Sequence, residues 1–171
     1  MIQIFNMATR KLTLSSLLCA VALILSYIES LIPPFFAVPG IKIGLPNLVI
    51  VFILYRLGAK YAFAVSLLRV AISSLLFGSL LTALYSTAGA AVSLLLMLLA
   101  KKLSLFSEVG VSIIGGISHN AAQIAVAAIV METSQIVYYL PALIISGTLT
   151  GALIGIGGAV LIKKLKLKEK Y

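Results

Sequence analysis

The sequence has no aspartate, one cysteine and one histidine among its 171 residues. Its only acidic residues are Glu29, Glu108, Glu132 and Glu169. Clustered carboxylates hold Mg²⁺ on a diphosphate, and zinc or redox sites need several Cys or His ligands. The sequence also lacks the glycine-rich ATPase motif. We therefore expect no metal site, no other cofactor and no catalytic residues.

Charged residues are scarce as well, at 10% of the chain, whereas apolar residues make up 62% and the mean hydropathy is +1.21. This composition is typical of an integral membrane protein. The net charge of +9 would suggest nucleic acid in a soluble protein. Here the basic residues stand at the ends of apolar runs, where they fix topology and contact anionic lipid. We expect membrane lipid as a partner and no nucleic acid.

Six apolar segments approach the roughly 20 residues that a membrane-spanning helix needs. They cover residues 12–31, 43–57, 61–77, 80–100, 109–131 and 137–161. The second segment is the shortest and carries Pro46 near its start, where the first turn of a helix tolerates proline. The sequence predicts an all-α integral membrane protein in which residues 1–171 form one compact bundle of six transmembrane helices.

The basic residues indicate the orientation of this bundle. If the chain crosses six times, all of the 13 Lys and Arg residues except Lys42 and Arg69 lie on one side. By the positive-inside rule, the N- and C-termini are then cytoplasmic and the connection from Glu29 to Asn47 is extracytoplasmic. We expect a multi-pass protein of the bacterial cell membrane.

Arg69 stands inside the third apolar segment. It lies nine residues beyond Lys60, which is about 13 Å along a helix and close to the middle of the bilayer. A charge at that depth costs several kcal/mol unless it faces protein, water or a counter-ion. A structural explanation is a buried ion pair with Glu29 or hydrogen bonds to helix carbonyls. The functional explanation is contact with an anionic or carbonyl-bearing substrate.

The fifth segment carries a polar stripe at a similar depth, in which His119 and Gln123 share one helix face. Polar side chains from four segments thus fall in the middle or outer half of the membrane. They are Glu29, Lys42, Asn47, Arg69, His119, Asn120 and Gln123. We hypothesise that they line one outward-opening substrate pocket, with the connection around Pro33, Pro34 and Gly40 as its lid. The alternative is that each polar group serves only its own helix end.

Small residues form two further stripes. Gly147, Gly151 and Gly155 recur every four residues, a spacing that lets membrane helices pack closely within the chain or against a partner. A second stripe in the first segment is predicted to dock a partner protein. It consists of Ser15, Cys19, Ala22 and Ser26.

Four motifs carry a resemblance to a known family. They are Glu29-Ser-Leu-Ile-Pro-Pro, Pro39-Gly-Ile-Lys-Ile-Gly-Leu-Pro-Asn47, Leu68-Arg69-Val70 with Leu76-Phe77-Gly78, and Ser118-His119-Asn120-Ala121-Ala122-Gln123. Together they resemble the membrane family known both as heptaprenyl diphosphate synthase component I and as Gx transporter. That family is similar to the S components of energy-coupling-factor (ECF) transporters. The latter similarity implies a six-helix fold, capture of a vitamin-like molecule from outside, and partnership with a T subunit and ATPase subunits.

Two functions follow as hypotheses. The first is a membrane substrate-binding, S-component-like subunit of an uptake transporter for a vitamin-, quinone- or isoprenoid-related small molecule. The alternative is a non-catalytic membrane accessory component of heptaprenyl diphosphate or menaquinone synthesis, with a soluble prenyl synthase subunit as its partner. A third, weaker option is a scaffold without a ligand, in which the polar residues bind only one another.

Overall fold

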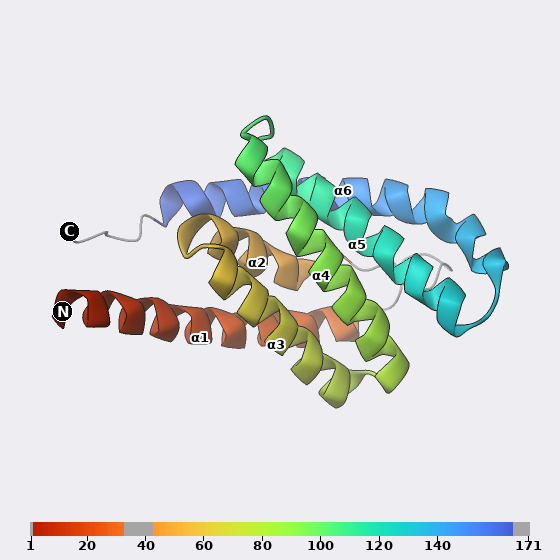
Figure 1. Cartoon of the computed structure of the whole chain (residues 1–171), viewed down its shortest axis with the longest axis horizontal. Coiled ribbons are helices and arrows are strands. Elements are labelled where there is room, and N and C mark those ends of the chain that lie inside the picture. The colour runs from red at the N-terminus through yellow and green to blue at the C-terminus, as the bar shows by residue number, and fades with distance from the viewer. Residues whose placement is uncertain (1, 33–42, 166–171) are drawn as a thin grey trace.

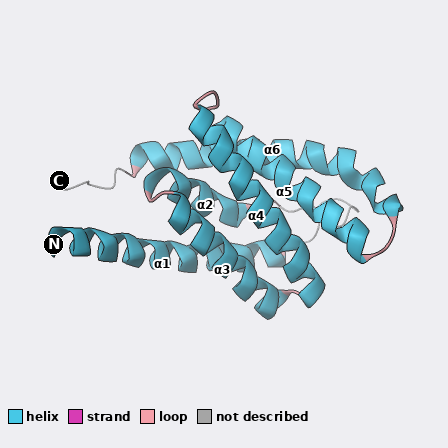
Figure 2. Ribbon diagram, viewed as in Figure 1, coloured by secondary structure: helices cyan, strands magenta, loops and turns pink. Residues whose placement is uncertain are grey.

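The computed structural model describes residues 2–32 and 43–165, with side chains from residue 9 onward, and this part of the chain is helical apart from short connections (Figure 2). The elements are α1 (Ile2–Leu31), α2 (Leu45–Arg56), α3 (Ala59–Phe77), α4 (Leu80–Leu103), α5 (Glu108–Val130), the 3₁₀ helix η1 (Ser134–Tyr139) and α6 (Leu140–Lys164). The prediction of an all-α protein is confirmed. Lys42 and the predicted lid residues Pro33, Pro34 and Gly40 lie outside the described residues.

Five helical stretches are long and apolar enough to cross a membrane. They are Thr9–Leu31, Ala59–Phe77, Leu80–Leu103, Glu108–Val130 and Ser134–Lys164. α2 has only 12 residues, about 18 Å at 1.5 Å per residue, which is shorter than a hydrocarbon core of about 30 Å. The chain is therefore a multi-pass membrane protein. α2 lies within the predicted second segment, residues 43–57, and its count as a sixth transmembrane helix stays a prediction.

The short helix α2 lies inside the bundle, between α1 and α6 in Figure 1. Every residue from Val49 to Leu54 is buried, and Ile53 and Leu54 are fully enclosed. The helix starts after Gly44, whose φ of 79° is readily adopted only by glycine among common residues, and Pro46 occupies its first turn. Because neighbouring helices surround α2, its end need not meet lipid, and a helix that stops at mid-depth is tolerated.

One end of the bundle carries the Lys and Arg residues of the α2–α3 connection, the end of α4 and the end of α6. The start of α1 and the end of α6 both lie on the left in Figure 1. Lys101 Nζ donates a 2.7 Å hydrogen bond to the Leu54 carbonyl and lies 4.6 Å from the ring centroid of Tyr55. Arg56 Nη2 donates to the carbonyl of Ile162. These bonds join the last turn of α2 to α4 and α6. We call this the basic end; its cytoplasmic orientation stays a prediction.

The glycine stripe of α6 lies against α5. A Cβ atom added at Gly147, Gly151 or Gly155 would come within 2.7–2.8 Å of α5 backbone atoms. Real Cβ atoms do not approach backbone so closely, so only glycine permits this contact. Of the two explanations given for the stripe, the structure therefore supports helix packing within the chain.

The small stripe of α1 faces inward. Its four residues are Ser15, Cys19, Ala22 and Ser26, and each is at most 9% exposed. α1 packs against α2 and α3, and small side chains let the helix backbones approach one another. The docking prediction for this stripe is therefore wrong for the structure described, because a partner could reach it only if the bundle opened.

Candidate functional site

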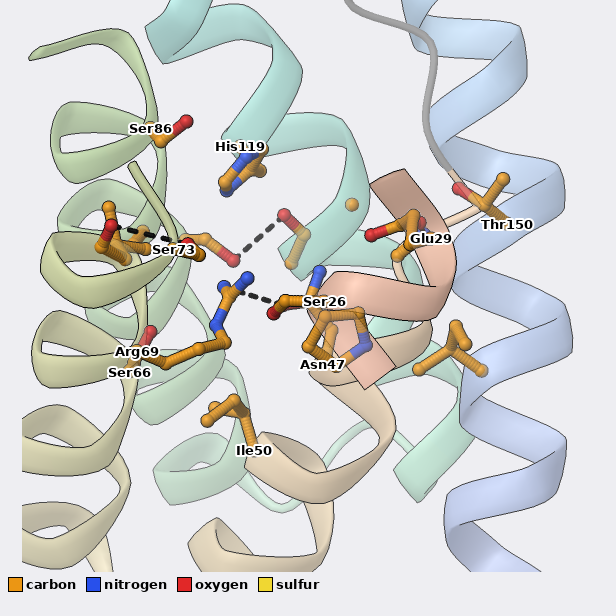
Figure 3. Close-up of a pocket in the computed structure, with 18 of the residues that line it drawn as sticks. Ser26, Glu29, Asn47, Ile50, Ser66, Arg69, Ser73, Ser86, His119 and Thr150 are labelled. Atoms are coloured by element: carbon orange, nitrogen blue, oxygen red, sulfur yellow. Dashed lines mark hydrogen bonds between the residues drawn. The ribbon is translucent and has the colours of Figure 1, made fainter. Parts of the chain in front are cut away.

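A cavity of about 160 Å³ lies inside the bundle and is lined by residues of α1 to α6. Figure 3 shows the side chains that converge on it. Every predicted binding residue that the structure describes lines this cavity, namely Glu29, Asn47, Arg69, His119, Asn120 and Gln123. We call it the polar chamber. That these residues share one space agrees with the depths counted from the sequence; their binding role stays a prediction.

The chamber reaches the end of the bundle opposite the basic end. Its lining includes Ser30 near the end of α1, Phe77 at the end of α3 and Thr82 in the first turn of α4. In the other direction it extends to Met97 and Ser112. The chamber therefore runs from one end of the bundle into its interior.

Arg69 projects from α3 toward the centre of the chamber (Figure 3). Its Nη2 donates to Asn47 Oδ1 at 3.4 Å, which is longer than the 2.7–3.2 Å of a strong N–H···O bond. Its Nε is buried and has no hydrogen-bond partner among the described residues. A guanidinium has five N–H donors, so this buried cation is incompletely satisfied.

Glu29 is engaged elsewhere. Its Oε1 accepts a hydrogen bond from the amide of Gly44 and a longer one, at 3.4 Å, from the amide of Leu45. The carboxylate therefore caps the N-terminus of α2, where unpaired amides and the helix dipole favour negative charge. Glu29 attracts Arg69 electrostatically, but within the described residues the two side chains form no ion pair. The ion-pair explanation of Arg69 is wrong for this structure.

The start of α2 lies near the level of Arg69. Asn47 stands nine residues before Arg56, and Arg69 nine residues after Lys60, so both are about 13 Å from the basic end. The contact between the two side chains agrees with that count. The Glu29 carboxylate already caps the partial positive charge of this helix N-terminus. The guanidinium of Arg69, with its unpartnered Nε, is therefore the group among the described residues that can bind an anion in the chamber.

The polar side chains of α5 contact two different helices. Asn120 Nδ2 donates a 2.7 Å bond to the carbonyl of Leu143, which ties α5 to α6. His119 and Gln123 lie against α4 at Gly89, where an added Cβ would come within 3.0 Å of both side chains. The sequence analysis did not single out Gly89, although it makes the room that these two side chains occupy.

Serines of the chamber were also missed. Ser66 and Ser73 lie seven residues apart on α3, as Ser86 and Ser93 do on α4, and all four line the chamber. Ser93 donates a 2.9 Å bond to the carbonyl of Gly115 on α5. Polar residues seven apart share a helix face, so this spacing within two apolar segments was a signal that could have revealed them.

The described residues contain no group of three or more His, Cys, Asp or Glu side chains that could hold a metal ion. The chemistry that the chamber offers is therefore hydrogen bonding and charge, supplied by one guanidinium, one carboxylate, amides, hydroxyls and an imidazole.

Long apolar helices around a polar chamber define a polytopic membrane protein with an internal polar site. The sequence model of the family described as heptaprenyl diphosphate synthase component I matches residues 18–161. Since the match covers most of the chain, the protein belongs to this family, as the four motifs predicted. No curated protein and no solved structure matches the chain. The resemblance to the S components of ECF transporters rests on the sequence motifs alone.

Proposed function

We propose that this protein is a non-catalytic membrane component of heptaprenyl diphosphate synthesis and that it works with a soluble prenyl synthase subunit. The observation that carries the proposal is the family match over residues 18–161. The family is described as one component of a synthase, which implies at least one other.

The residues of the chain support this division of labour. The sequence has no aspartate, whereas a diphosphate-bound Mg²⁺ needs clustered carboxylates. The soluble subunit would supply those carboxylates. A heptaprenyl chain is strongly apolar and gains about 0.8 kcal/mol for each CH₂ that enters lipid, so a component embedded in the membrane would keep synthesis close to where the product partitions.

The basic end offers a surface for the soluble subunit. Exposed lysines stand on three of its helices, and they are Lys60, Lys102, Lys163 and Lys164. Surface charges of one sign guide association with a partner of opposite sign and mainly affect its rate. An acidic face on the synthase subunit would complement this end.

Co-purification tests the proposal. The tagged full-length protein is extracted in mild detergent, and the proteins retained with it are identified by mass spectrometry. We expect an aspartate-rich prenyl synthase subunit, whose retention should fall when Lys60 and Lys102 are both changed to Glu. Retention of ATPase and T subunits instead would contradict the proposal.

A second candidate is a substrate-binding subunit of an uptake transporter, and the polar chamber favours it. A scaffold has no need of a cavity that gathers six predicted binding residues from four helices. In this case the partners would be the T and ATPase subunits of an energy-coupling module, and the substrate a vitamin-, quinone- or isoprenoid-related molecule. The same co-purification separates the two candidates.

A further inference from the structure

We propose that the polar chamber is a binding site for a small molecule that carries an oxyanion, either a carboxylate or a phosphate, and that Arg69 holds this group. The inference goes beyond both candidate functions, because it concerns the chemistry of the ligand and does not depend on which proteins the chain binds.

The first observation behind the proposal is that the Arg69 guanidinium is incompletely hydrogen-bonded. Among the described residues, Arg69 has one long hydrogen bond, to Asn47, and its buried Nε has no partner. The Glu29 carboxylate attracts Arg69 but does not hydrogen-bond to it, since its Oε1 accepts from the start of α2. A buried guanidinium whose donors are mostly unpaired is costly inside a membrane protein. An oxyanion in the chamber could accept two parallel N–H bonds from the guanidinium.

Arg56 shows why the chamber matters as well as the charge. Its Nε is also buried and unpartnered, but its Nη2 donates to the carbonyl of Ile162. Arg56 stands at the C-terminus of α2, where the helix dipole favours a cation, and it does not line the chamber. Arg69 differs in having both an incomplete set of acceptors and an open space in front of it.

The volume of the chamber limits the size of the ligand. At about 160 Å³ it is close to the 150 Å³ cavity that holds benzene in an engineered protein. The enclosed part of the ligand therefore has on the order of ten non-hydrogen atoms or fewer. A heptaprenyl chain does not fit, although its diphosphate headgroup would. The oxyanion thus belongs either to a free small molecule or to the headgroup of an isoprenoid.

Binding to the purified full-length protein in lipid nanodiscs tests the proposal. The probes are benzoate, inorganic phosphate, inorganic diphosphate and farnesyl diphosphate, each titrated by calorimetry. We expect at least one to bind, and Arg69→Gln to weaken that binding about tenfold or more, because a hydrogen-bonded charge is lost. Lys102→Gln removes the same charge from an exposed position at the basic end and should bind as the wild type does.

The source of the oxyanion follows from the ranking of the probes. If farnesyl diphosphate binds at least tenfold more tightly than inorganic diphosphate, the oxyanion belongs to an isoprenoid headgroup. If benzoate, phosphate or diphosphate binds with an affinity equal to or higher than that of farnesyl diphosphate, the oxyanion belongs to a free solute. If no probe binds the folded wild-type protein, or if Arg69→Gln binds equally well, the proposal is overturned.

A second pair of variants keeps the test decisive if Arg69→Gln does not fold. Ser86→Leu on α4 fills part of the chamber and changes no charge, so it should abolish binding. Thr87→Leu is the matched control, since Thr87 is exposed and does not line the chamber. Equal binding by Ser86→Leu and Thr87→Leu would show that the chamber is not the site.

Discussion

The two faces of α5 are packed in different ways. Gly116 meets the backbone of α6 at Gly147, with no room for a Cβ atom between them. Its neighbour Gly115 faces α4, where an added Cβ would come within 2.6 Å of Met97 Sδ and 3.2 Å of Ser93 Oγ. One face of α5 thus contacts backbone, and the other contacts side chains. Side chains can shift and backbone cannot, so we expect an added methyl group to cost more at the α5–α6 contact.

The largest expected effect comes from adding a methyl group at the α5–α6 contact. Gly151→Ala would place a methyl group 2.8 Å from Ile113 Cα, and overpacking of this kind costs about 1–3 kcal/mol. We expect a clearly lower melting temperature in detergent. Gly157→Ala is the control, because a Cβ there meets only the flexible end of the Leu48 side chain. Equal melting temperatures for the two variants would contradict the comparison.

The next effect concerns the basic end, where the side chain of Lys101 joins α4 to α2. Lys101→Met removes the 2.7 Å hydrogen bond to the Leu54 carbonyl and the contact with Tyr55. We expect a loss of about 1–2 kcal/mol, measured by thermal melting. Lys102→Met makes the same change at the exposed neighbouring residue and should leave the melting temperature within error of the wild type.

A smaller effect is expected where the chamber meets the start of α2. Glu29→Ala removes the acceptor of the Gly44 and Leu45 amides, and loss of such a cap costs about 1 kcal/mol. Glu29→Gln keeps an acceptor oxygen and should retain most of that stability, with only the charge interaction with the helix dipole lost. If Ala and Gln destabilise the protein equally, the carboxylate does not act as a cap.

The smallest effect on stability is expected at Arg69, the residue most important to the chamber. Arg69→Met removes a cation with only one long hydrogen bond. One long hydrogen bond offsets little of the cost of burying this charge, so an apolar side chain of similar length should fit the position with little loss of stability. The free energy of unfolding of the ligand-free variant should therefore be within about 0.5 kcal/mol of the wild-type value, or higher. A loss as large as that of Lys101→Met would mean that Arg69 is structural.

Much of this arrangement could be predicted from the sequence because it depends on composition along the chain. Apolar runs bounded by Lys and Arg located the helices, and the shortest predicted segment, residues 43–57, contains the short helix α2. Only the packing of α1, α3 and α6 around α2 lets it end inside the bundle.

Depth along a helix could also be counted, and Arg69 and His119, which that count placed at similar depth, do line one chamber. The partner of Glu29 could not be predicted, since the amides at the start of α2 became available only through tertiary packing. Likewise, the spacing of Cys19 and Ala22 is the same for a stripe that faces a partner protein and for one buried in the bundle.

The central claim is that the polar chamber holds a small anionic molecule. Native mass spectrometry of the gently extracted wild-type protein, beside Ser86→Leu and Thr87→Leu, tests it most directly. We predict an added small mass on the wild type and on Thr87→Leu, and its loss from Ser86→Leu. A folded wild-type protein without any bound small molecule, or the same added mass on all three proteins, would contradict the claim.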